Sequence, residues 1–542
     1  MYIVQIASEC APVIKAGGLG DVVYGLSREL DTQGHCVELI LPKYDCMRYD
    51  HIWGLHEAYC DLKVPWYDSV IYCTVHCGWV HGRLCFFIEP HSGDNFFNRG
   101  VFYGAPDDPM RFAFFSKAAL EFLQQSNKCP DIIHCHDWQT GLIPVMLYEM
   151  YQYHGLEFQR ICYTIHNFKH QGQTGYNVLA AIGLNRPDYY FHPDRLQDPL
   201  NLFALNCMKG GIVYSNYVTT VSPHHAWEAR HTDVGCGLGH TLHLHQHKFT
   251  GVLNGIDYGF WDPEGDHHLP YPYSKENFDN KARNKKVLRE RLNLQDEVDK
   301  PLIAYIGRLD QQKGVHLLHH AMYYALHHNA QFVLLGSATE ASINNQFWHE
   351  KNFLHSNKDC HLEISFNEEL AHLIYAAADL VLVPSNYEPC GLTQIIGLKY
   401  GTVPIVRGVG GLVNTVFDRD YDATKAPEER NGYVFYQSDF PAIESAIARG
   451  IGLWYDYPEE FCKLAIQGMK YDYSWRNPAA EYVKIYDLIR YKHKPIAASD
   501  ERIEPASPPE SLPETTKAES LSEPSATTMQ AVVEAKKNIS SR

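Results

Sequence analysis

Short apolar runs alternate with helical patterns along this chain, in two successive series. In the first series, residues 2–7, 36–41, 131–135, 161–166 and 217–222 have the length and composition of buried strands. The second series follows a Pro/Gly/His-rich stretch at 261–272 and contains residues 302–307, 332–336, 380–384 and 403–407. Strands that alternate with helices form parallel sheets. The sequence therefore predicts an α/β fold with two doubly wound, Rossmann-like domains.

The expected boundaries follow from this pattern and from the composition of the C-terminal part. Residues 1–258 form the first domain, with a possible hinge at the turn Asn254-Gly255, and residues 259–473 form the second. Residues 474–495 contain a helix with an apolar stripe. Residues 496–542 are rich in Pro, Ser, Glu, Thr and Ala and contain no aromatic residue, which predicts disorder. A docking or regulatory role for this tail stays open.

Composition excludes several classes of protein. The net charge of -17 argues against non-specific binding to nucleic acid or to an anionic membrane. The 15 Cys are scattered through apolar segments, as expected in a reducing compartment. No apolar stretch approaches the roughly 18 residues needed to span a bilayer. We therefore expect a cytoplasmic protein, or a plastid protein if a transit peptide has been removed; the oligomeric state is not predicted.

One carboxylate occupies a conspicuous turn between a buried strand and a helix. The segment 385–394 reads SNYEPCGLTQ and follows the apolar run 380–384. Glu388 is thus expected at the carboxyl end of a parallel strand, where α/β folds bind ligands. The amides of Gly391, Leu392 and Thr393 open the next helix and would suit a phosphate. A simple turn-capping role for Glu388 is the structural alternative.

Two cations follow the first strand of the second domain. Arg308 and Lys313 lie in the segment 306–315, IGRLDQQKGV, at the corresponding end of the predicted sheet. Hydrogen bonds to charged groups contribute on the order of 1.5–3 kcal/mol each, enough to hold a diphosphate and to stabilise it as a leaving group. A solvated basic pair is the alternative.

A glycine-rich loop follows the first strand of the chain. It reads KAGGLGD and contains Lys15, Gly17, Gly18 and Asp21. Glycines permit close approach of the backbone to a diphosphate or sugar, and the lysine supplies a positive charge. The dinucleotide-binding spacing Gly-x-Gly-x-x-Gly is absent. A plain tight turn is the alternative.

Polar residues also end two buried strands of the first domain. Asp137 follows the run HCH, and His166 and Asn167 follow the run YTI. These side chains supply both donors and acceptors, which suits sugar hydroxyls. No second ligand pair stands at zinc spacing, so no metal site is predicted.

Together these motifs resemble those of the bacterial glycogen synthases and plant starch synthases, which transfer glucose from ADP-glucose to an α-1,4-glucan. The matching segments are KAGGL from Lys15, HDW from His136, TIHN from Thr164, LNGID from Leu253, Arg308 to Gly314, and EPCGLTQ from Glu388. They occur in the family's order over about residues 1–490. The stretch from Arg99 to Phe112 looks most like the starch synthase III/IV branch.

The resemblance implies a GT-B fold with an interdomain cleft, and transfer to the non-reducing end with retention of configuration, without metal or cofactor. The implied catalytic residues are Glu388, His166, Arg308 and Lys313. The implied substrate-binding residues are Lys15, Gly17, Gly18, Asp21, Asp137, Asn167, Asn254, Phe366, Cys390, Gly391, Leu392 and Thr393. Phe366 stands where the family often has a tyrosine against the adenine, so the stacking face is kept and a hydroxyl is lost.

Three other hypotheses are kept open at this stage. A UDP-sugar transferase or a nucleotide-sugar epimerase would use the same fold and the same cations. A glucan-binding or priming scaffold with weak catalysis is suggested by the acidic tail and by Phe366. The expected partners are ADP-glucose and an α-1,4-glucan, with no nucleic acid and no membrane.

Overall fold

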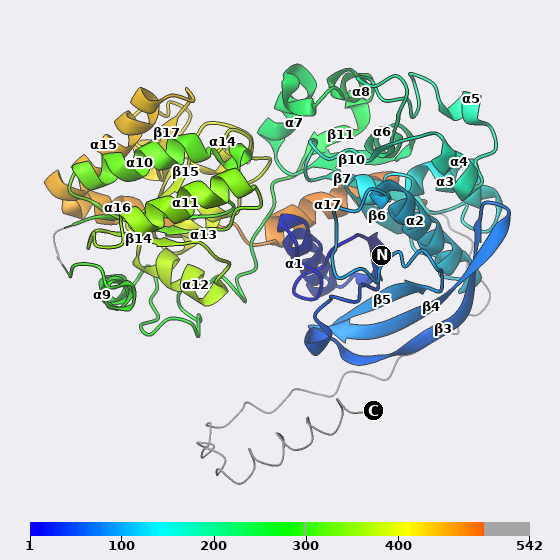
Figure 1. Cartoon of the computed structure of the whole chain (residues 1–542), viewed down its shortest axis with the longest axis horizontal. Coiled ribbons are helices and arrows are strands. Elements are labelled where there is room, and N and C mark those ends of the chain that lie inside the picture. Colours follow the sequence, from blue (N-terminus) through cyan, green and yellow to red (C-terminus); the bar gives the residue numbers. More distant parts are fainter. Residues whose placement is uncertain (297–299, 493–542) are drawn as a thin grey trace, which may run out of the picture. The chain divides into compact units, whose positions relative to one another are not determined.

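The computed structural model describes residues 1–296 and 300–492. Within them, one sheet has nine strands in the order β11-β10-β7-β6-β1-β2-β5-β4-β3 (Figure 1). Its strands are β1 (Tyr2–Ile6), β2 (Cys36–Pro42), β3 (Trp53–Trp66), β4 (Ser69–Val80), β5 (Arg83–Pro90), β6 (Ile132–His136), β7 (Arg160–Ile165), β10 (Tyr217–Thr220) and β11 (Phe249–Gly251). We call this sheet and its helices the N-terminal lobe. The predicted tail, 496–542, lies outside the described residues.

The helices of the N-terminal lobe connect the parallel strands. They are α1 (Gly18–Thr32), α2 (Asp108–Gln125), α3 (Ile143–Glu149), α4 (Asn177–Ile182), α5 (Pro187–Tyr190), α6 (Cys207–Tyr214), α7 (Pro223–His231) and α8 (Gly239–Leu244). A small two-stranded antiparallel sheet of β8 (Gln173–Thr174) and β9 (Leu205–Asn206) accompanies them. Helix α2 is almost wholly buried, which fits its many aromatic and aliphatic residues, although Arg111, Lys117 and Glu121 are buried with them.

A second sheet has six parallel strands in the order β14-β13-β12-β15-β16-β17. We call this sheet together with its helices the C-terminal lobe. These are β12 (Leu302–Ile306), β13 (Gln331–Leu335), β14 (Cys360–Glu363), β15 (Leu380–Val383), β16 (Val403–Arg407) and β17 (Tyr433–Phe435). The helices are α9 (Asn280–Leu292), α10 (Val315–His327), α11 (Ala341–Phe353), α12 (Glu368–Ala377), α13 (Thr393–Lys399), α14 (Gly411–Thr415), α15 (Phe440–Asp456) and α16 (Pro458–Met469).

The predicted strands are confirmed, but the sequence pattern missed the antiparallel part of the first sheet and three short parallel edge strands, β11, β14 and β17. Strand β4 pairs antiparallel with both β3 and β5. Strand β3 is interrupted by register shifts and is exposed along much of its length. Its weak alternation of polar and apolar residues explains why the pattern did not reveal it.

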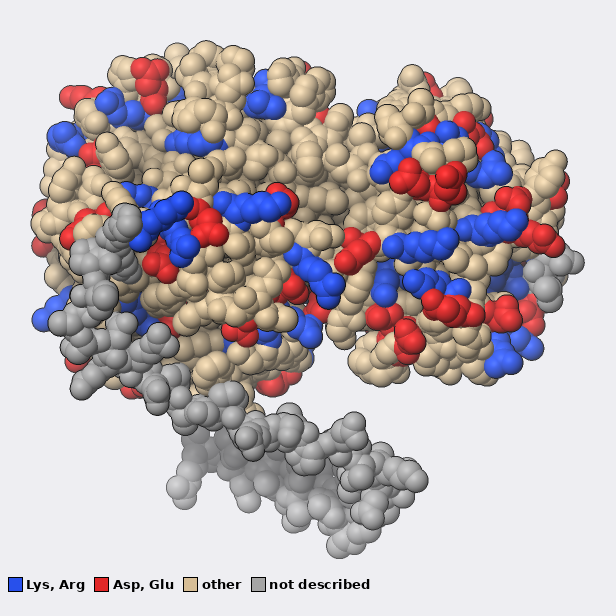
Figure 2. Space-filling model, turned by 180° about the vertical axis from the view of Figure 1, so that it is seen from behind, with Lys and Arg blue, Asp and Glu red and all other residues tan. Residues whose placement is uncertain are grey.

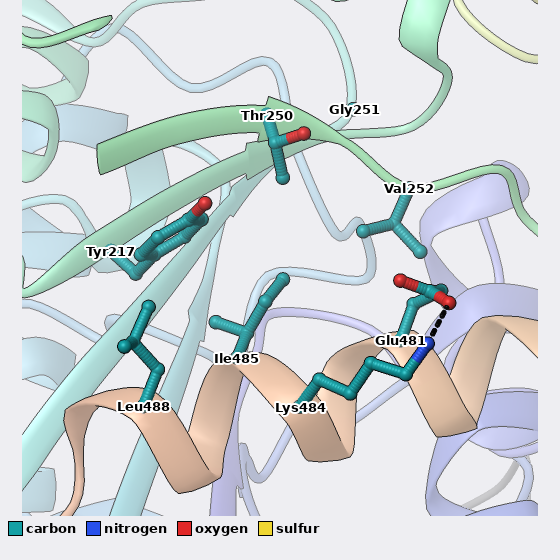
Figure 3. A pocket seen from close by; sticks show the side chains of 8 residues that line it. All are labelled: Tyr217, Thr250, Gly251, Val252, Glu481, Lys484, Ile485 and Leu488. Carbon is teal, nitrogen blue, oxygen red and sulfur yellow. Dashed lines mark hydrogen bonds and ion pairs between the residues drawn. The ribbon is translucent and has the colours of Figure 1, made fainter. Parts of the chain in front are cut away.

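The last helix, α17 (Arg476–Ile489), packs on the N-terminal lobe although it follows the C-terminal lobe in sequence (Figure 1). Trp475, Tyr482 and Tyr486 form one apolar cluster with residues of β1, α1 and β6. Figure 3 shows a shallow pocket of about 280 Å³ between α17 and the strands β10 and β11, lined in part by Ile485 and Leu488. No predicted site residue lines this pocket.

Charge is mixed over the surface that Figure 2 shows. Lysine and arginine side chains lie among aspartates and glutamates, so the net negative charge is not gathered into one patch on this face. Among residues 1–296 and 300–492, no helix is both long and apolar enough to cross a membrane.

Candidate active site

Glu388 is held in the turn between β15 and α13. Its carboxylate is buried, with the residue 6% exposed. One oxygen, Oε2, accepts hydrogen bonds from Lys313 Nζ at 2.6 Å and from Ser385 Oγ at 2.8 Å. A buried carboxylate with a cation and a hydroxyl on the same oxygen is fixed in position, because leaving either partner unpaired would be costly.

Lys313 is positioned by the loop that follows β12. Asp310 caps the short helical turn Gln311–Lys313, its Oδ1 accepting from Lys313 N at 2.9 Å. Gly314 then adopts a φ of 72°, and a Cβ there would lie 2.2 Å from Pro384 O. The amide of Asn386 donates to Gln312 O at 2.8 Å. The two loops therefore pack backbone to backbone, and this packing brings Lys313 to Glu388.

Arg308 belongs to the same loop but has few contacts. Its side chain is 58% exposed, and its Nη1 lies 3.3 Å from Asp310 Oδ2. Its charge also lowers the pKa of His170, after the larger effect of burial. Arg308 thus faces the segment that follows His166, as a largely solvated cation available to an anionic ligand.

Asp137 holds the backbone of the predicted sugar-binding residues His166 and Asn167. Its Oδ1 accepts from the amide of His166 at 2.7 Å and from that of Asn167 at 3.4 Å. Burial raises the pKa of the Asp137 carboxyl to about 7, although these two hydrogen bonds act to lower it. Asp137 also has a φ of 55°, which is uncommon for a residue other than glycine and is typical of functional sites. Asp137 therefore fixes the backbone that carries His166 and Asn167.

His166 and Asn167 meet the Glu388 turn through residues next to them in sequence. The amide of Phe168, which follows Asn167, donates to the hydroxyl of Tyr387 at 3.1 Å. Ser222 Oγ donates to Pro389 O at 2.6 Å from the other side of Glu388. The structure thus brings the strand ends of the N-terminal lobe beside the Glu388 turn.

The glycine-rich loop is held by a residue that the sequence reasoning missed. The carboxylate of Glu9 accepts from the amides of Ala16 at 2.7 Å and Gly17 at 2.9 Å. Lys15 Nζ pairs with Asp21 at 2.9 Å and lies 3.9 Å from Glu368. Glu9 stands directly after the first strand, in the same position as the other strand-end residues, and that position was the signal that could have revealed it.

The remaining predicted residues differ in their surroundings. Phe366 is 77% exposed, with its ring free to stack on a flat ligand. Asn254 and Cys390 are buried, and Asn254 Oδ1 has no hydrogen-bond partner among the described residues. Gly391 adopts a φ of 77° just before α13, Leu392 caps that helix, and Thr393 Oγ1 donates to Ile306 O. Gly18 begins α1.

Gly410 gives a direct test of how tightly the Glu388 turn is packed. A Cβ at this residue would lie 1.9 Å from Glu388 O, and its φ is 51°. We expect Gly410→Ala to displace the turn, to destabilise the protein by about 1–3 kcal/mol and to lower turnover. Thermal unfolding and initial rates measure both effects. Gly452→Ala is the matched control, because no atom lies within 4 Å of its added Cβ; equal behaviour of the two variants would contradict the packing argument.

Glu228 of α7 accepts a hydrogen bond from the amide of Gly410, in the loop before α14. From the lowered pKa of its carboxyl we expect the stability of the protein to depend on pH. Burial would raise the pKa of its carboxyl, but hydrogen bonds from His224, His225 and the Gly410 amide outweigh burial and lower it to about 2. A lowered folded-state pKa stabilises the protein above the ordinary value of 4.5, and this stabilisation is lost as pH falls toward 2. We expect Glu228→Gln to cost up to about 3 kcal/mol at pH 7.

Unfolding midpoints of the wild type and of Glu228→Gln, measured between pH 7 and pH 2.5, check this prediction. The difference should be constant above pH 5 and should shrink below pH 4.5. A difference that does not change with pH would show that the carboxylate charge is not the source of the stabilisation.

The assembled site combines two cations with a carboxylate, one of the cations being in contact with it. Lys313 and Arg308 can neutralise a diphosphate, while Glu388, His166 and Asn167 present polar groups to a sugar. Among residues 1–296 and 300–492, no group of three or more His, Cys, Asp or Glu side chains is arranged to hold a metal ion.

Comparison with known proteins identifies the family of this chain. Residues 2–244 match the family model of the starch synthase catalytic domain, and residues 288–456 match that of glycosyl transferases group 1. The chain is 75% identical over 492 residues to a probable glycogen synthase 2 of Nostoc sp., covering 91% of this chain and all of that protein. It is 56% identical over 488 residues to glycogen synthase 2 of Methylococcus capsulatus, covering 90% of this chain and all of that protein.

A solved structure extends the match to the fold. The catalytic domain of starch synthase IV from Arabidopsis thaliana, bound to ADP and acarbose, superposes with a TM-score of 0.87 at 42% identity. The match covers 90% of this chain and 99% of that one. Both the GT-B fold and the resemblance to the starch synthase IV branch are thereby confirmed. The chain belongs to the glycogen and starch synthase family of glycosyltransferases.

Proposed function

We propose that this enzyme transfers glucose from ADP-glucose to the non-reducing end of an α-1,4-glucan, with retention of anomeric configuration. The observation that carries the proposal is the buried Lys313–Glu388 pair, whose turn is joined by the hydrogen bond from Phe168 N to the Tyr387 hydroxyl to the segment that follows Asn167. The ADP in the related starch synthase IV structure supports the adenine nucleotide as donor.

The proposed chemistry follows from where charge develops. As the anomeric bond breaks, the leaving diphosphate gains negative charge and the sugar becomes oxocarbenium-like. Arg308, Lys313 and Lys15 would bind the diphosphate, with the amides of Gly18 and Gly391–Thr393 beside it. Glu388 would stabilise the positive charge on the sugar, because its carboxylate is already fixed by Lys313 and Ser385.

The other predicted residues have supporting roles in this proposal. His166, Asn167 and Asp137 would position the glucose, Phe366 would stack on the adenine, and Asn254 and Cys390 would line the site. Gly17 and Asp21 would shape the loop around Lys15. Since the cations supply the positive charge that diphosphate departure requires, we propose that the reaction needs no metal.

The proposal extends to the organisation and setting of the protein. We propose that residues 1–258 bind the acceptor, that residues 259–473 bind the nucleotide sugar, and that residues 474–495 form a helix that returns to the first domain. The cluster of Tyr482 and Tyr486 with that lobe supports the last point. A cytoplasmic location is proposed from the bacterial glycogen synthases to which the chain is similar.

A single assay tests the donor, the acceptor and the metal requirement. Purified protein is incubated with glycogen and either ADP-glucose or UDP-glucose, with and without EDTA, while glucose incorporation and nucleotide diphosphate release are followed. We expect incorporation from ADP-glucose, unaffected by EDTA. Incorporation from UDP-glucose alone would show that the donor is UDP-glucose and not ADP-glucose. Conversion of the sugar nucleotide in the absence of acceptor would indicate an epimerase. Glycogen binding without turnover would indicate a scaffold.

A further inference from the structure

We infer that His136 sets the tautomer of His166, so that His166 presents a donor N–H, from its Nδ1, to the bound sugar. The inference rests on the proposed function, because it takes His166 as a residue that contacts a sugar hydroxyl. His136 would then be a positioning residue, acting on substrate through its neighbour.

The two imidazoles share one hydrogen bond. His136 Nδ1 lies 3.1 Å from His166 Nε2, and their rings are 5.3 Å apart. Burial lowers the pKa of His166 to about 3 and that of His136 well below its usual value. Both rings are therefore neutral near pH 7, and each carries a single ring proton. One ring must donate to the other, which leaves two possible arrangements.

The far side of His136 distinguishes the two arrangements. His136 Nε2 is buried and has no hydrogen-bond partner among the described residues. If His166 donated, His136 would carry its proton on Nε2, leaving a buried N–H without an acceptor. If His136 donates, Nε2 carries only a lone pair. Unpaired buried N–H groups are rare, while unpaired acceptors are tolerated somewhat better. The second arrangement is thus favoured, and it places the proton of His166 on Nδ1.

The ring of His136 is also prevented from reorienting. It lies against the ring of His134, with centroids 4.2 Å apart and an angle of 31° between the planes. His134 is itself fixed by Thr164 Oγ1 at 2.6 Å and by the hydroxyl of Tyr486 at 2.8 Å. Tyr486 belongs to α17, so the C-terminal helix supports the layer of side chains beneath His166.

Substitution of His136 by asparagine or leucine tests the inference. An asparagine amide can place an N–H where Nδ1 stood, whereas leucine has a similar size and no donor. We expect His136→Asn to keep kcat for glucose transfer within about 5-fold of the wild type. His136→Leu should lower kcat on the order of 10- to 10²-fold, as removal of a group that orients a functional histidine does in metal sites. The Kd for ADP should change little in either variant.

Discrimination among donor analogues should change only if His136 acts on substrate through His166, and not if its role is purely structural. ADP-glucose analogues that each lack one sugar hydroxyl show which hydroxyls the wild type contacts, and the analogue that His166→Ala no longer discriminates against identifies the hydroxyl that His166 contacts. His136→Asn should keep this discrimination and His136→Leu should lose it. Equal kcat values for the two variants, or unchanged discrimination in His136→Leu, would overturn the inference.

Two further comparisons keep the outcome unambiguous. If His136→Leu fails to fold, His136→Asn is compared with His136→Asp, whose side chain has the same shape but whose carboxylate only accepts hydrogen bonds. We expect the asparagine variant to be the more active. Equal or greater activity of the aspartate variant would overturn the inference. Failure of the proposed function would instead appear as no transfer from ADP-glucose by the wild type.

Discussion

Replacing Glu388 with alanine is expected to lower kcat for glucose transfer by at least ~10²-fold, since losing one preorganised charge at a reacting centre has effects of that size. Glu388 Oε2 is held by Lys313 and Ser385 before any substrate binds, so its charge needs no reorganisation when the sugar becomes positive. The loss should fall on kcat rather than on the Kd for ADP, because Glu388 would interact with the transferred sugar.

Two further variants distinguish loss of the Glu388 charge from a general effect of removing a glutamate. Glu388→Gln keeps the shape of the side chain and removes the charge, so a comparable loss would assign the effect to charge. Glu459→Ala, on the exposed first turn of α16, is the control for removal of a surface glutamate. Unchanged unfolding midpoints would exclude a folding defect. Turnover near that of the wild type in Glu388→Ala would refute the assigned role.

Strand positions were predictable from the sequence because buried parallel strands are short and continuously apolar. The runs that became β12 and β15 stand out for this reason. Strand-end placement likewise predicted that Glu388, Lys313 and His166 would lie near ligand-binding edges. The antiparallel strands β3 and β4 were not predictable in this way, because one of their faces is solvated and β3 is bulged.

Pairings between distant residues were beyond the reach of local pattern. The Lys313–Glu388 contact depends on Gly314 approaching Pro384 O, a distance that no sequence spacing determines. Helix α17 had an evident apolar stripe, but its packing on the N-terminal lobe depends on Tyr486 reaching His134. Glu9 could have been suspected from its position after the first strand, but its hydrogen bonds to the Ala16 and Gly17 amides could not. His136 stands in a motif that the sequence offers, but its contact with the ring of His166 is likewise visible only in the structure.

The Lys313–Glu388 pair gives the second large expected effect. Lys313→Ala removes a cation from the proposed diphosphate site, so we expect kcat/KM for ADP-glucose to fall on the order of 10²- to 10³-fold. It also leaves the buried Glu388 carboxylate without its cation, which should destabilise the protein by about 3 kcal/mol. Lys463→Ala, in an exposed pair on α16, is the matched control.

The double variant Lys313→Ala/Glu388→Gln separates the two effects. Neutralising Glu388 removes the uncompensated buried charge, so the unfolding midpoint should rise again above that of Lys313→Ala. Activity should not recover, because both groups act on the same transition state and their losses are not additive. Stability would then recover between the single and the double variant, while turnover would stay low. If turnover recovered together with stability, Lys313 would be a structural partner of Glu388 and not part of the catalytic machinery.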